Sequence, residues 1–193
     1  MIIDQIEYIN EDFKEDLLER LRGNIFHLTT KRAFELIKEN GFAYHNKNNK
    51  FALNTTSEKS FGRNRGWVCL FDLRKQSRAI IDETLMKYYF LRPSWFIRHE
   101  PEFTESNLAY LFVHPREYNR IIPNDTAKKV WLETKKCEHY VPKTECWYPS
   151  NMPLECVGKV LLVRIYENAP KHNPFLYAHH QLAVEKERAK NRG

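Results

Sequence analysis

Residues 141–149 read Val141-Pro142-Lys143-Thr144-Glu145-Cys146-Trp147-Tyr148-Pro149, an alternating pattern between prolines. Alternation with a period of two is typical of a half-buried β-strand, and it puts Glu145 and Trp147 on one face with Cys146 and Tyr148 on the other. Proline cannot donate to a strand ladder, so the flanking prolines predict a short strand at a sheet edge or beside a cleft. The pattern therefore predicts a carboxylate, that of Glu145, held in place by a strand.

Outward from this stretch, the chain mixes strand and helix patterns. The near-continuous apolar run 158–166 predicts a central strand, and further strands are expected at 24–30, 51–57, 67–73 and 108–113 and near residue 95. Helices are expected at 10–22, 30–41, 79–91, 124–133 and 178–190. This order predicts one α+β domain over residues 1–193, built on a bent, mixed or antiparallel sheet, with helices 10–22 and 178–190 as appendages.

His27 lies in the middle of the strand expected at 24–30. Thr30 then caps a helix that ends at Gly41, so the strand and helix boundaries are well defined. A histidine in such a strand is either satisfied within the core or faces a pocket, and the strand pattern alone leaves both readings open.

These two neighbourhoods, His27-x-Thr29 running into a helix that ends at a glycine and Glu145 on a proline-bounded strand, resemble the DarT-type DNA ADP-ribosyltransferases. The resemblance implies an ADP-ribosyltransferase fold and NAD as substrate. It implies that Glu145 is the catalytic carboxylate and that His27 and Thr29 bind NAD.

The resemblance extends less specifically to the strand end at Asn54 and Thr55 and to the glycine-bounded loop expected at 61–66. It implies that Asn54 and Thr55 support the cofactor, that Arg65 contacts it, and that Arg63 takes part in catalysis. Ordinary turn chemistry explains Asn54 and Thr55 equally well, and a solvated basic loop is an alternative for both arginines. Residues 88–95 fit either the end of a helix or an aromatic segment of that family.

The charge balance permits a polyanionic partner. Thirty-one lysines and arginines stand against 25 acidic residues, a formal net charge of +6. The resemblance implies a nucleic-acid acceptor, above all a base in single-stranded DNA, and a toxin that an antitoxin protein could restrain. Transfer to RNA or protein, and a non-catalytic nucleic-acid-binding domain, are the alternatives. The apolar runs are too short for a membrane span and the first residues do not read as a secretory signal, so a cytoplasmic protein is expected.

Three of the four cysteines, Cys137, Cys146 and Cys156, lie near His139 in the sequence. Their spacing lacks the close pairs of zinc sites, and four cysteines this unevenly placed do not predict a disulfide scaffold. We therefore expect reduced thiols and no metal.

Overall fold

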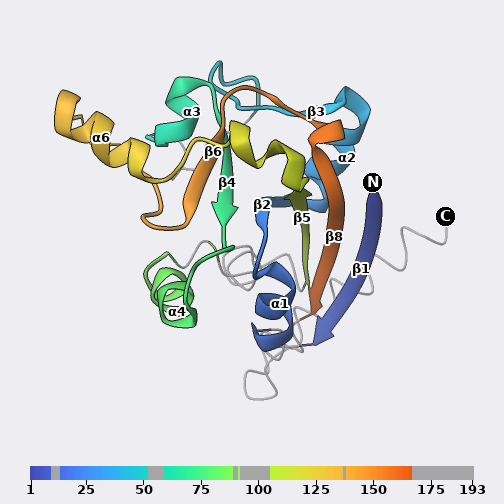
Figure 1. Ribbon diagram of the computed structural model, residues 1–193. Coiled ribbons are helices and arrows are strands. Elements are labelled where there is room, and N and C mark those ends of the chain that lie inside the picture. Colours follow the sequence, from blue (N-terminus) through green and yellow to red (C-terminus); the bar gives the residue numbers. More distant parts are fainter. Residues whose placement is uncertain (10–13, 52–58, 89–90, 92–104, 137, 167–193) are drawn as a thin grey trace, which may run out of the picture.

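A six-stranded sheet forms the centre of the computed structural model, which describes residues 1–9, 14–51, 59–88, 91, 105–136 and 138–166. Across the sheet the strands run β1 (Ile2–Ile9), β8 (Val157–Tyr166), β5 (Glu105–Val113), β2 (Ile25–Thr30), β4 (Val68–Asp72) and β6 (Glu145–Tyr148). β1 is parallel to β8 and every other neighbouring pair is antiparallel, as Figure 1 shows. The expected α+β class and mixed, mostly antiparallel sheet are confirmed.

Helices cover both faces of the sheet. They are α1 (Lys14–Leu21), α2 (Lys31–Asn40), α3 (Phe61–Arg65), α4 (Arg78–Lys87) and α6 (Asp125–Thr134), with short 3-10 helices at Pro115–Arg120 and Leu154–Cys156. A two-stranded ribbon pairs β3 (Phe42–Ala43) with β7 (Met152–Pro153). Apart from Phe51, the strand expected at 51–57 lies outside the described residues, as do the strand near 95, the helix 178–190 and most of segment 88–95.

One face of the sheet packs against α2. The α2 residues Phe34 and Ile37 join Ile25 of β2 and Leu111 of β5 in the larger core. Its ends form as the sequence predicts: the Thr30 hydroxyl accepts a hydrogen bond from the Ala33 amide, and Gly41 closes the helix with a left-handed φ of 78°.

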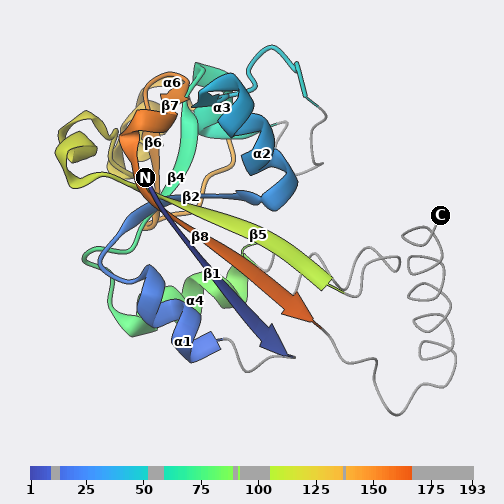
Figure 2. The ribbon, with the colours of Figure 1, turned by 90° about the vertical axis from the view of Figure 1, so that its right-hand side faces the viewer.

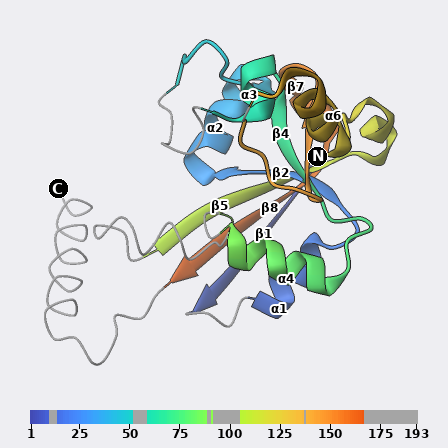
Figure 3. The same cartoon turned by 90° about the vertical axis from the view of Figure 1, so that its left-hand side faces the viewer.

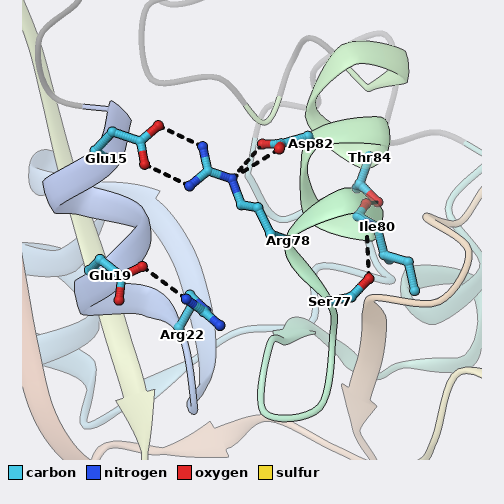
Figure 4. A network of polar contacts seen from close by, with 8 residues as sticks. All are labelled: Glu15, Glu19, Arg22, Ser77, Arg78, Ile80, Asp82 and Thr84. Carbon is cyan, nitrogen blue, oxygen red and sulfur yellow. Dashed lines mark hydrogen bonds and ion pairs between the residues drawn. The ribbon is translucent and has the colours of Figure 1, made fainter.

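The opposite face packs against α1 and α4, which lie together on one side of the strands in Figure 3. Leu17, Leu18 and Leu21 of α1 and Ile81 of α4 are buried there. On the surface, Arg78 of α4 donates two hydrogen bonds of 2.6 Å to the Glu15 carboxylate and a further pair to Asp82 (Figure 4). The two helices are thus held together by an apolar core and an exposed ion-pair network.

Helix α3 and strand β1 differ from the sequence prediction. Residues 61–65, expected as a loop, form helix α3, because Ser60 caps its start and Gly66 ends it with a left-handed φ of 78°. β1 was not predicted as a strand at all. Ile6 and Tyr8, two residues apart, pack against the core beneath α1, which is the period-two signal that could have identified it.

The sheet separates into two parts between β2 and β4. These strands pair only at Ile25 with Asp72 and at Phe26 with Phe71. Beyond that point β2 continues along β5, whereas β4 continues along β6. In Figure 2 the two strands diverge from this point, with β2 running toward α2 and β4 running toward α3.

Candidate functional site

His27 is the first residue of β2 beyond the split. In a continuous antiparallel ladder the Cys69 carbonyl would accept its next hydrogen bond from the β2 backbone, since bonded pairs recur every second residue. Here it lies 2.8 Å from His27 Nδ1 instead. A carbonyl can only accept, so Nδ1 carries the proton and Nε2 is the acceptor of the neutral ring. The His27 imidazole N–H thus replaces the β2 backbone N–H as the donor to the Cys69 carbonyl.

The environment of His27 favours that neutral form. Burial lowers the pKa of His27, and the hydrogen bond to the Cys69 carbonyl opposes this effect. Thr29, the other expected NAD-binding residue of β2, is half-buried and lies on the same face as His27, opposite Ala109 of β5. The structure therefore offers a neutral imidazole and a hydroxyl along one strand.

Glu145 lies on β6, which forms an edge of the six-stranded sheet, as the prolines predict. The strand is not half-buried: all four of its residues are buried, and Glu145 is only 4% exposed. Glu145 Oε2 accepts a hydrogen bond of 2.6 Å from the Val141 amide, and Oε1 accepts one of 2.8 Å from Trp147 Nε1. Both carboxylate oxygens are therefore oriented by donors of the same short segment.

Burial raises the pKa of Glu145. The Val141 amide, the Trp147 indole and the Cys69 thiol oppose that rise by donating to the carboxylate. The pKa of the Cys69 thiol is in turn raised, first by burial and then by the charge of Glu145. Cys69 thus lies beside both candidates: its carbonyl contacts His27, and its side chain lies on the face of β4 that carries Glu145 and Trp147 across the β4–β6 pairing.

The resemblance also implies that His27 and Glu145 face one NAD cleft, but the two side chains belong to opposite faces of the sheet, so that expectation was wrong. Glu145 pairs with Phe71, which pairs with Phe26, so Glu145 belongs to the Phe26 face. Side chains alternate along a strand, which puts His27 on the opposite face. The two residues do lie close to the same point, Cys69 at the split. His27 contacts the Cys69 carbonyl, and Glu145 lies on the face that carries the Cys69 side chain.

A small aromatic core fixes Trp147 and, through it, Glu145. Phe61 of α3 and Ala127 of α6 pack against the fully buried Trp147. Gly62 permits this approach, because a Cβ at that position would lie 2.2 Å from Trp147 Cδ1 and 2.6 Å from Nε1. Helix α3 can therefore cover Trp147 only with glycine at position 62.

Asn124, at the start of α6, holds the turn before Glu145. Its amide donates to the carbonyls of Val141 and Glu145, and its Oδ1 accepts from the Lys143 amide, whose residue has a left-handed φ of 68°. Sequence reasoning identified neither Asn124 nor Cys69 as part of the site. Trp147 carried a usable signal, because the same alternation placed it beside Glu145.

Both candidate arginines lie in α3 and have protein partners. Arg65 forms a 2.7 Å ion pair with Glu138 and stacks at 3.6 Å on the Phe61 ring. Arg63 donates at 2.6 Å to Asn49 Oδ1 and at 3.4 Å to the Asn46 carbonyl. Their expected roles in binding or catalysis stay predictions. Asn54 and Thr55 lie outside the described residues.

Other features of the described chain lie apart from this site. A cavity of about 210 Å³ is lined by Arg20, His114, Tyr118 and Lys159 among others, and by none of the candidate residues. Within the described ranges, no three His, Cys, Asp or Glu side chains are grouped so that they could hold a metal ion. Nor does this part of the chain contain a helix long and apolar enough to cross a membrane.

Comparison of the chain with protein-family models, with curated proteins and with solved structures finds no match.

Proposed function

We propose that this protein is an NAD-dependent ADP-ribosyltransferase that modifies nucleic acid, with a base of single-stranded DNA as acceptor, in the manner of a toxin or defence effector. The proposal rests on the resemblance to the DarT-type enzymes described above. The observation that carries it is the position of Cys69, where β2 and β4 separate: its carbonyl contacts His27, and it pairs with Trp147, whose indole donates to Glu145.

On this proposal NAD enters the split between β2 and β4. Breaking its nicotinamide glycosidic bond develops positive charge on the ribose, and a fixed carboxylate directed at that sugar stabilises the transition state. Glu145 is suited to this role because two N–H groups fix its orientation. One of those contacts has to yield to a ribose hydroxyl when NAD binds. The neutral His27 then offers Nε2 as an acceptor to another hydroxyl of the dinucleotide.

The net charge of +6 supports a nucleic-acid acceptor, since neutralising phosphates is the main source of affinity in such complexes. Transfer to RNA or to a protein side chain would use the same two residues, Glu145 and His27, to act on NAD. On this proposal an antitoxin protein is a further partner.

A second candidate is a non-catalytic nucleic-acid-binding domain. The observation that favours it is the state of Glu145, whose two oxygens already accept hydrogen bonds and which is 4% exposed. Such a carboxylate would serve only to hold β6, α3 and the turn at Val141 together.

Incubation with labelled NAD and a panel of single-stranded DNA, RNA and protein, followed by mass spectrometry, separates these functions. A mass gain of one ADP-ribose on an acceptor supports the transferase. The gain should disappear in Glu145→Ala and persist in the matched control Glu155→Ala, which removes an exposed glutamate of a 3-10 helix. Wild-type protein that binds oligonucleotides but transfers nothing to any acceptor would support the binding domain instead.

A further inference from the structure

Basic residues outnumber acidic ones over residues 40–71. Residues 40–71 contain five lysines and arginines, namely Lys47, Lys50, Lys59, Arg63 and Arg65, and a single acidic residue, Glu58. Arg65 is neutralised by Glu138. Lys47 and Lys50 lie in the loop 44–51, where both are exposed. This loop therefore carries exposed positive charge with no acidic residue of its own.

The loop is closed by hydrogen bonds of its own. The side-chain amide of Asn46 donates to the Phe51 carbonyl and accepts from the Phe51 amide, both at 3.0 Å. Asn46 and Asn49 adopt left-handed φ angles of 53° and 54°, a conformation that asparagine tolerates better than most residues. Asn46 thus fixes both ends of the turn and presents the residues between them.

The rest of the fold anchors the loop. Arg63 of α3 donates to Asn49 Oδ1 and to the Asn46 carbonyl. On the other side, the His45 amide donates at 3.2 Å to Asn151 Oδ1. A surface fixed in this way loses little conformational entropy when a ligand binds, which favours affinity.

Aromatic rings flank the two lysines of the loop. Tyr44 stacks on His45 with ring centroids 4.9 Å apart, and Phe51 meets Tyr44 edge-on at 5.8 Å. Lys50 Nζ lies 5.6 Å from the centroids of both Tyr44 and Phe51, and Phe51 is 40% exposed. An exposed ring bordered by lysines fits the alternating bases and phosphates of a single strand.

We propose that loop 44–51 is the docking platform for single-stranded nucleic acid. Phe51 stacks on a base, and Lys47 and Lys50 contact the phosphates beside it. This assignment rests on the proposed function in taking nucleic acid as the acceptor, but it does not require that transfer occur. A base on Phe51 would displace Lys50 from the ring toward the backbone.

Fluorescence anisotropy with a labelled oligo(dT) tests the platform. We expect Phe51→Ala to weaken binding by about five- to 150-fold, the range for losing one stacked base. The double variant Lys47→Gln/Lys50→Gln should reduce the salt dependence of log affinity by about 0.7 per lysine. Matched controls on α6, Trp131→Ala and Lys128→Gln/Lys129→Gln, remove an exposed ring and two exposed lysines and should bind as the wild type does.

Titration of NAD into the same variants separates the failure of the platform from the failure of the proposed function. The platform proposal is wrong if the platform variants bind oligo(dT) as tightly as the wild type, or if the control variants lose as much oligo(dT) affinity as the platform variants do. It is also wrong if the platform variants lose NAD affinity while their oligo(dT) affinity is unchanged. Loss of oligo(dT) binding in the platform variants alone supports it, even if the wild-type protein transfers no ADP-ribose.

Discussion

Replacing Gly62 with alanine should disturb the candidate site through Trp147, without changing any of the site's polar side chains. The added Cβ would lie 2.2 Å from Trp147 Cδ1 and 2.6 Å from Nε1. The indole cannot retreat freely, because it is fully buried and its ring centroid lies 4.8 Å from that of Phe61 and 6.3 Å from that of Tyr140. Trp147 must therefore shift, and its hydrogen bond to Glu145 Oε1 is the contact most directly exposed to that shift.

Three effects set the size of the destabilisation. Overpacking a core costs about 1–3 kcal/mol. Leaving a buried acceptor unpaired costs about 1–3 kcal/mol. Alanine recovers about 1 kcal/mol of helix propensity relative to glycine. We expect a net loss of about 3 kcal/mol in the free energy of unfolding, which for a chain of this length lowers Tm by about 6–12 °C.

Urea denaturation followed by tryptophan fluorescence and circular dichroism measures this loss. The matched control is Gly158→Ala, whose Cβ would lie 3.3 Å from His114 Cδ2 and 3.7 Å from His114 Cα and Cβ, distances without a severe clash, and which should stay close to the wild type. A Gly62→Ala protein within about 0.5 kcal/mol of the wild type, the usual range of surface substitutions, would refute the reasoning. Equal destabilisation by Gly158→Ala would refute it too, since the effect would then not come from Trp147.

Three further predictions concern the polar groups. Glu145→Ala should reduce ADP-ribosyl transfer on the order of a hundredfold to a thousandfold while NAD affinity in calorimetry changes little, because the carboxylate acts on transition-state charge; a parallel fall in affinity would contradict this. Burial raises the pKa of Glu145, so the folded state retains the carboxyl proton to a higher pH than the unfolded state does. The stability that comes from the neutral carboxyl therefore falls as the pH rises from about 4.5 through the native pKa. The difference in unfolding free energy between the wild type and Glu145→Gln should therefore decline over that window and then level off; a difference that does not change with pH would show that the native pKa is not raised. Elemental analysis should find no zinc bound to the cysteines, and about one zinc per chain would overturn the expectation drawn from their spacing.

The parts of the fold that the sequence predicts well are those with local chemical signals. The Thr30 cap and Gly41 fixed α2, and the apolar run 158–166 identified the interior strand β8. The prolines around Glu145 correctly indicated an edge strand. In each case the residues that decide the structure are neighbours in the chain.

The parts that could not be predicted depend on contacts between distant segments. No local pattern brings Cys69 to both His27 and Glu145, since that contact follows from the pairing of β4 with β6 and the end of its pairing with β2. The opposite facing of His27 and Glu145 has the same origin, because alternation gives relative faces within a strand but not between strands. Helix α3 was missed because five residues including a glycine carry too little periodicity.

The pairing of β1 with β8 has a consequence for the order in which the protein folds. Ile2 lies beside Lys159, so the first strand of the described sheet in chain order pairs with the last one. Such non-local contacts form slowly, because the entropy of closing a long loop is lost before the strand pairing contributes any stability. Until β8 is made, β1 carries Ile2, Ile3 and Ile6 with both of its edges unpaired, which is the kind of segment that associates with other chains. Slowing translation near residues 157–166 should therefore lower the yield of soluble protein more than slowing it near residues 14–21.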